Sequence, residues 1–213
     1  MIVAKENINW QIGVTPLILE NIQEEVLNIS IYDRDISHMK REIKELLQQE
    51  INLKINGDIY SILNQLNVAI NQNQYGHIIN DIKELIEHFK RISNSNNFRL
   101  TLAAIDNNMC RRFHTDMNDL RMICTYSGPG TLWLTENNTN RMPLNNTGNN
   151  DSIVINENKI KQLSTGSVAI LKGALYPGER TKAAVHRSPN IEESKQVRLF
   201  LRIDTNDFLN FQI

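Results

Sequence analysis

The stretch CRRFHTDMNDLRMICTYSGPGTLWL, residues 110–134, decides the fold. Apolar and polar residues alternate along most of it, and a period of two is typical of a strand with one buried face. A Gly-Pro-Gly turn at residues 128–130 interrupts the alternation. The stretch therefore predicts three short strands, at residues 110–117, 120–127 and 131–134.

The same pattern extends over the whole second half of the chain, in short β-rich segments separated by turns. Eight short strands in succession favour a jelly roll, in which two sheets pack face to face. A long polar loop at residues 136–151 interrupts the series and could cover a site. The further strands are expected at residues 98–105, 152–156, 167–173, 183–188 and 196–204.

The first half of the chain has the apolar period of amphipathic helices. A polar, turn-rich stretch, SNSNN at residues 93–97, marks the main boundary. We therefore expect an α+β protein in which a mainly helical region, residues 1–97, packs against a jelly-roll region, residues 98–213, as one compact unit. Helices are expected at residues 15–28, 35–50, 58–72 and 76–93, and short strands at 27–34 and 51–57.

The composition is that of a globular protein without a strong charge of either sign. Of the 213 residues, 40% are hydrophobic and the net charge is -1, so nothing indicates a nucleic-acid partner. The N-terminal sequence does not read as a secretory signal, and no apolar run approaches the roughly 20 residues that span a bilayer. We expect a cytoplasmic protein with no membrane partner, and free thiols at Cys110 and Cys124.

His114 and Asp116 form a His-x-Asp motif inside the predicted strand 110–117. Residues i and i+2 of a strand point to the same side, so the two side chains should project together. The site of non-haem iron enzymes that has two histidines and one carboxylate uses such a pair and a distal histidine. His186, on the predicted strand 183–188, is the candidate for that distal ligand.

A basic residue follows this histidine on the next predicted strand. Arg198 and Arg202 lie on one face of residues 196–204, and a guanidinium group is well shaped to bind the far carboxylate of a 2-oxo acid. Arg198 is the first candidate and Arg202 the second. Either could instead be a solvated strand arginine.

Four more residues are candidates for the wall of the same cavity. Cys110 and Arg112 have the strand parity of His114, so they would line the pocket. Tyr126 is a candidate contact to the cosubstrate and Trp133 a candidate pocket residue. Both aromatic residues could equally be core or rim side chains.

Four blocks of the second half resemble a bacterial family catalogued as domain of unknown function 1826. The resemblance lies in residues 110–134 together with GSVAILKG at 166–173, AVHRSP at 184–189 and RLFLRID at 198–204. The helical half resembles the family only in its layout. This family name implies no activity.

A looser resemblance is to the iron and 2-oxoglutarate dioxygenases. It is carried by His114, Asp116, His186 and the later Arg198. It implies a double-stranded β-helix, that is a distorted jelly roll, with Fe(II) on the three ligands and 2-oxoglutarate as cosubstrate.

Three functions are compatible with these residues. The first is an Fe(II)- and 2-oxoglutarate-dependent oxygenase that oxidises a C–H bond of a small-molecule or peptide substrate of unknown identity. The second is a cupin-like protein that binds zinc or another divalent metal and has no oxygenase activity, because two histidines and a carboxylate also suit zinc. The third is an interaction module in which the three residues meet by coincidence.

Overall fold

Two β-sheets form the centre of the computed structural model, which describes residues 9–145 and 149–205. The large sheet has seven strands in the order β1-β2-β8-β5-β10-β4-β3, and the small sheet has three in the order β7-β6-β9. The strands of the large sheet are β1 Trp10–Gly13, β2 Ile29–Tyr32, β3 Asn52–Gly57, β4 Phe98–Ile105, β5 Leu120–Ser127, β8 Val168–Lys172 and β10 Arg198–Thr205. Those of the small sheet are β6 Leu132–Leu134, β7 Lys161–Gln162 and β9 Val185–Arg187.

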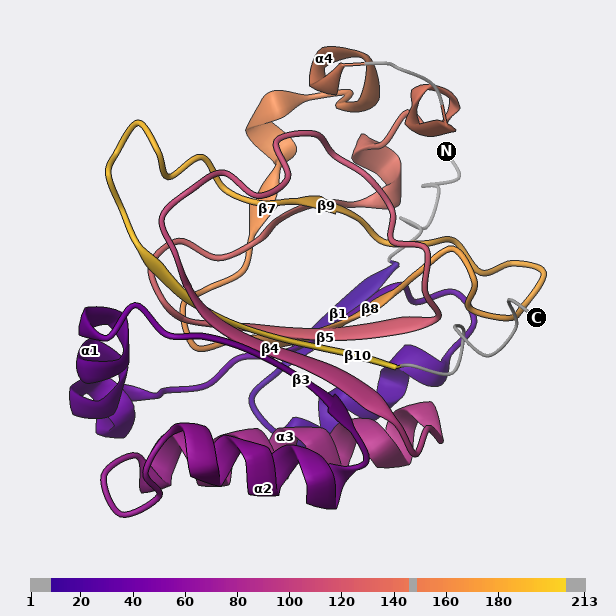
Figure 1. Ribbon diagram of the computed structural model, residues 1–213. Helices are drawn as coiled ribbons and strands as arrows, with labels where there is room; N and C mark the ends of the chain where they lie inside the picture. The colour runs from indigo at the N-terminus through magenta and orange to yellow at the C-terminus, as the bar shows by residue number, and fades with distance from the viewer. Residues whose placement is uncertain (1–8, 146–148, 206–213) are drawn as a thin grey trace.

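Helices cover the face of the large sheet that lies away from the small sheet (Figure 1). The main helices there are α1 (Lys40–Gln48), α2 (Ile59–Ala69) and α3 (Gly76–Ser93). Shorter helical segments complete the chain: η1 Pro16–Gln23, η2 Ser37–Met39, η3 Glu136–Asn138, η4 Met142–Asn145, α4 Asn150–Ile153 and η5 Glu157–Lys159. Among the described residues, no helix has the length and apolar character needed to cross a bilayer.

The large sheet separates two apolar cores, because side chains alternate between the two faces of each strand. On β10, Leu199 and Leu201 belong to the core between the sheet and the helices. Phe200, between them, belongs to the core between the two sheets. Arg198, Arg202 and Asp204 have the parity of Phe200, so β10 presents its three charged residues to the space between the sheets.

Most of the predicted elements are present close to their expected positions. Strands β4 and β5 span residues 98–105 and 120–127, and α3 spans 76–93, as the periodicity predicts. The expected helix at 15–28 is a 3-10 helix, η1. Strands β1 and β7 were not predicted, since each has fewer than five residues and too little alternation to recognise.

Two predicted strands are wrong. Residues 110–117 form an irregular segment with a single β-bridge, between His114 and His186, because the backbone of Phe113 is bound instead by the side chain of Asn150. Residues 152–156 begin inside α4, which Asn149 caps by accepting a hydrogen bond from the Ser152 amide. The predicted loop at 136–151 contains short helical segments, and its residues 146–148 lie outside the described residues.

The N-terminal half contributes strands as well as helices. β3 pairs with β4 at one edge of the large sheet, and β2 pairs with β8 near the other edge. The fold is therefore a mixed α+β arrangement in which the first 97 residues do more than pack helices against a barrel.

Candidate metal centre

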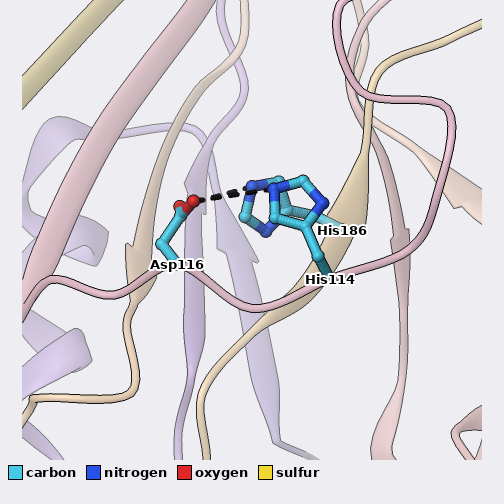
Figure 2. Close-up of side chains that lie close together, drawn as sticks. All are labelled: His114, Asp116 and His186. Atoms are coloured by element: carbon cyan, nitrogen blue, oxygen red, sulfur yellow. Dashed lines mark ion pairs between the residues drawn. The ribbon is translucent and has the colours of Figure 1, made fainter. Parts of the chain in front are cut away.

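The backbone brings the two candidate histidines together between the sheets. His114 and His186 exchange both backbone hydrogen bonds, each with an N–O distance of 3.0 Å. Paired residues in an antiparallel bridge project to the same side, so both imidazoles point to one place, and their ring centroids are 4.7 Å apart. Asp116 reaches the same place from the irregular segment that follows His114 (Figure 2).

The three side chains converge on one point. Their candidate ligand atoms all lie within 4.8 Å of one another. His186 Nε2 is 3.4 Å from Asp116 Oδ2, and His114 Nε2 is 3.6 Å from Asp116 Oδ1. The second separation is too long for a direct hydrogen bond. Donor atoms of one metal ion, at bond lengths of about 2.0–2.2 Å, lie at comparable separations from one another.

Each imidazole is oriented by a backbone carbonyl on its other nitrogen. His114 Nδ1 lies 3.0 Å from the carbonyl oxygen of Arg112, and His186 Nδ1 lies 3.3 Å from that of Ala184. A carbonyl oxygen only accepts, so each Nδ1 carries the proton and each Nε2 keeps its lone pair. Metal-binding histidines in proteins are held in the same way.

The carboxylate of Asp116 is held by a partly buried arginine on β5. Arg121 Nη1 lies 2.5 Å from Asp116 Oδ1, and Arg121 Nε donates to Asp204 Oδ1 at the same distance. Asp116 Oδ2 is buried and accepts no hydrogen bond from the described residues. A buried carboxylate oxygen without a donor is costly, so this atom fits a metal ligand.

The charges of the three residues suit metal binding. Burial lowers the pKa of His186 to about 4, so its ring is neutral at pH 7. Burial would raise the pKa of Asp116, but His186, His114 and Arg121 outweigh it and hold that pKa well below its usual range. An ionised carboxylate and neutral imidazole are the forms that bind a metal, and Asp116 and His186 are already in these forms. The Asp116 carboxylate raises the pKa of His114, which favours the protonated ring, so a metal ion would displace that proton on binding.

A cavity of about 50 Å³ adjoins this cluster. Its wall includes both histidines, Arg121, Arg202, Phe200 and Cys110. Two candidates of the sequence analysis, Cys110 and Arg202, thus line this cavity. The sequence analysis did not single out Arg121. The one signal available was that Arg121 lies two residues from Ile123 on a predicted strand, so both side chains point to the same side, and Ile123 also lines the cavity.

Arg198 does not line the cavity, but it packs against Phe200, which does. Its side chain is 1% exposed, and its guanidinium carbon is 4.7 Å from the centroid of the Phe200 ring. Its Nη2 donates to Thr125 Oγ1 at 3.0 Å, and its Nε has no acceptor among the described residues. Burial lowers the pKa of Arg198 to about 10, so it stays charged at pH 7.

Three predicted pocket residues lie elsewhere. Tyr126 is on the opposite face of β5, in the helix-side core, where its hydroxyl donates to Asp81 Oδ2 at 2.6 Å. Arg112 donates to the carbonyl oxygens of Pro143 and Leu144, because the segment that carries it is not a strand and strand parity does not apply. Trp133 pairs with His186 across β6 and β9 but lines a different cavity, near β7 and the edge of the large sheet.

Comparisons with known proteins identify a family and a fold. A family model described as protein of unknown function (DUF1826) matches residues 13–204. No curated protein matches the sequence.

Two solved structures are similar. One is the dioxygenase for auxin oxidation 1 from Arabidopsis thaliana, in a binary complex with 2-oxoglutarate. Its sequence is 11% identical to this chain, the match covers 93% of this chain and 92% of that one, and the TM-score is 0.55. The other is a prolyl-4-hydroxylase from Pseudomonas putida, 8% identical, with 89% and 96% of the two chains covered and a TM-score of 0.47. At these identities the first likeness concerns the fold alone.

Proposed function

We propose that this chain, which belongs to the DUF1826 family of proteins of unknown function, is a non-haem Fe(II)- and 2-oxoglutarate-dependent oxygenase. The observation that carries the proposal is the convergence of His114 Nε2, His186 Nε2 and the Asp116 carboxylate within 4.8 Å. Two imidazole lone pairs and a carboxylate oxygen without a donor face one point between the sheets. Such a set is stabilised by a cation at its centre.

The strand order supports a double-stranded β-helix. From β4 onward the chain alternates between the sheets: β4 in the large sheet, the His114 bridge on the small sheet, and β5 in the large sheet. It continues through β6 and β7 in the small sheet, β8 in the large, β9 in the small and β10 in the large. This gives the eight positions of a jelly roll. The shared fold with a dioxygenase solved with 2-oxoglutarate agrees with this reading.

His114, Asp116 and His186 would hold the Fe(II) ion on one face and leave its other positions open. When bound, the metal would activate dioxygen as the oxidant, and the 2-oxo acid would be its co-reductant, so that two electrons come from the decarboxylation of the acid and two from a C–H bond of the substrate. The protein fixes the ligands: the Arg112 and Ala184 carbonyls orient the two imidazoles, and Arg121 orients the carboxylate. Such supporting groups keep the ligand geometry rigid.

Arg198 would bind the far carboxylate of 2-oxoglutarate. No carboxylate forms an ion pair with Arg198 within residues 9–145 and 149–205, whereas Arg202 Nε lies 3.2 Å from Asp204 Oδ2. A buried cation without an anion is costly, so Arg198 is the better site for an anionic ligand. Phe200 lines the metal cavity and also packs on Arg198, so the carbon chain of the acid would pass along its ring.

The proposal is tested by titrating the metal-free protein with Fe(II) and 2-oxoglutarate under nitrogen. A visible charge-transfer band should appear, saturate near one equivalent, and be absent in His186→Ala. His88→Ala is the matched control, because His88 lies on α3, on the other side of the large sheet. The absence of a band together with tight retention of zinc would overturn the oxygenase assignment and favour a zinc-binding protein, since the ligand set also suits zinc.

A further inference from the structure

A second cavity, of about 340 Å³, is lined by residues of β1, β2, β6 and β7 and of the chain that follows β7, and it shares no lining residue with the metal cavity. It lies between the edge of the large sheet, at β1 and β2, and the small sheet, at β6 and β7. We call it the tryptophan pocket. Its apolar wall residues are Trp10, Trp133, Ile12, Ile31 and Leu163, and its polar ones are Lys161, Gln162, Ser164 and Ser167.

Both tryptophans of the chain line this pocket. Their rings meet edge to face, with centroids 5.2 Å apart and an angle of 65° between the planes. Trp133 is 3% exposed and therefore fixed in place, whereas Ile12 is 53% exposed and lies toward solvent. The pocket thus combines two aromatic rings and three aliphatic side chains with a few polar groups, and its volume is in the range of small-molecule sites.

Lys161 provides the charge of the pocket. Its Nζ is 4.7 Å from the centroid of the Trp10 ring and 5.8 Å from that of Trp133. No acidic residue lines the cavity, and no carboxylate pairs with Lys161 in the part of the chain that the structure describes. The nearby Asp33 accepts a hydrogen bond from Ser167, 2.6 Å long, and is not part of the wall.

We propose that the tryptophan pocket binds a small carboxylate with an apolar body. The body would pack on the two indole rings and on the apolar side chains, and the carboxylate would pair with Lys161. One ammonium group suits a monoanion, and a charge-assisted hydrogen bond at the mouth of an apolar pocket fixes the orientation of the ligand. The site is independent of the metal, because neither the cavity nor its residues include a candidate ligand of the metal centre.

Tryptophan fluorescence of the metal-free full-length chain tests the proposal, since both tryptophans line this pocket. The probes are cyclohexylacetate and its neutral counterpart, cyclohexylacetamide. The acid should change the emission saturably with one site, and the amide should bind at least tenfold more weakly. Lys161→Met should weaken binding of the acid at least tenfold and abolish the preference for it.

Lys159→Met is the matched control, because Lys159 lies on the neighbouring η5 and is outside the pocket; it should bind the acid like the parent protein. Trp10→Phe should retain a response from Trp133 and lower the affinity. Equal affinity for acid and amide, parental affinity in Lys161→Met, or no saturable change at millimolar acid would each overturn the proposal. Any of these results would mean that Lys161 only packs on the two indoles. The metal titration is unaffected by either outcome.

Discussion

His114 and His186 are joined by two backbone hydrogen bonds of 3.0 Å, and their rings stand 4.7 Å apart. The bridge holds two distant parts of the sequence in register at the place where the metal is proposed to bind. The imidazoles are thus placed by main-chain pairing before any metal is present. A preformed site loses little conformational entropy when the ion binds.

Asp116→Asn should weaken binding of Fe(II) roughly tenfold to a hundredfold or more, because an amide offers a poorer ligand and loses the ion pair with Arg121. Anaerobic calorimetric titration of the metal-free protein measures the affinity. Asp151→Asn, an exposed acid on α4, is the control and should bind the metal normally. Unchanged affinity in Asp116→Asn would remove this residue from the ligand set.

Arg198→Met should raise the Kd for 2-oxoglutarate of the Fe(II)-loaded protein by about tenfold to a hundredfold, the usual worth of a charge-assisted contact. Fe(II) affinity should not change. The metal-free variant should be at least as stable as the parent protein, because the substitution removes a buried charge without an anionic partner. A larger effect in Arg202→Met than in Arg198→Met would transfer the carboxylate-binding role to Arg202.

Tyr126→Phe should lower the free energy of unfolding by about 1 kcal/mol, since it removes the hydrogen bond to Asp81 and leaves the ring in the helix-side core. Urea unfolding measures this change. The affinity for 2-oxoglutarate should be the same as that of the parent protein, because the side chain lies on the far face of β5. A loss of cosubstrate affinity would place Tyr126 in the site after all.

Glu42 of α1 is buried and accepts hydrogen bonds from the amides of His77 and Ile78 at the start of α3. Burial would raise its pKa, but these amides and the His77 ring outweigh burial and lower it. A lowered pKa in the folded protein means stability that is present above the ordinary carboxyl pKa and is lost as the pH falls through the folded pKa. The loss of folding stability at acidic pH therefore depends in part on protonation of Glu42.

Glu42→Gln should cost about 1–2 kcal/mol at pH 7, the usual worth of a helix cap, and much less in acid, where the parent carboxyl is itself protonated. Urea unfolding across the acid range measures the difference. Glu45→Gln, on the same helix with a more exposed carboxylate paired to Arg41, is the control and should change stability by under about 0.5 kcal/mol. A cost for Glu42→Gln that does not vary with pH would contradict the assignment.

Gly130 lies where the turn after β5 meets the chain before β8. A Cβ at this position would be 2.0 Å from the carbonyl oxygen of Leu163, a backbone atom that cannot move aside. Gly130→Ala should therefore destabilise the protein by about 1–3 kcal/mol or more, as overpacking does. Thermal melts measure the change in stability. The control is Gly76→Ala, at an open position in the first turn of α3, which should be neutral or stabilising.

Local periodicity in the sequence determined the elements of the fold. The alternation of residues 98–105 and 120–127 predicted β4 and β5, and the apolar stripe of residues 76–93 predicted α3. Residue chemistry also singled out His114, Asp116 and His186 as one set. The periodic patterns depend on neighbours along the chain, and the identity and order of the three residues can be read from the sequence itself.

Only the tertiary structure decided which face of each strand meets the site. On β5, Arg121, Ile123 and Thr125 face the space between the sheets, and Tyr126 faces the helices. Both faces of this central strand are buried. The alternation of its side chains therefore defines two faces but does not indicate which of them meets the site. The irregular path of residues 110–117 was also decided by the tertiary structure. The conformation of this segment is set by contacts with Asn150 and His186, which are distant in sequence. Contacts between distant segments depend on how the whole chain packs, and a local pattern cannot specify them.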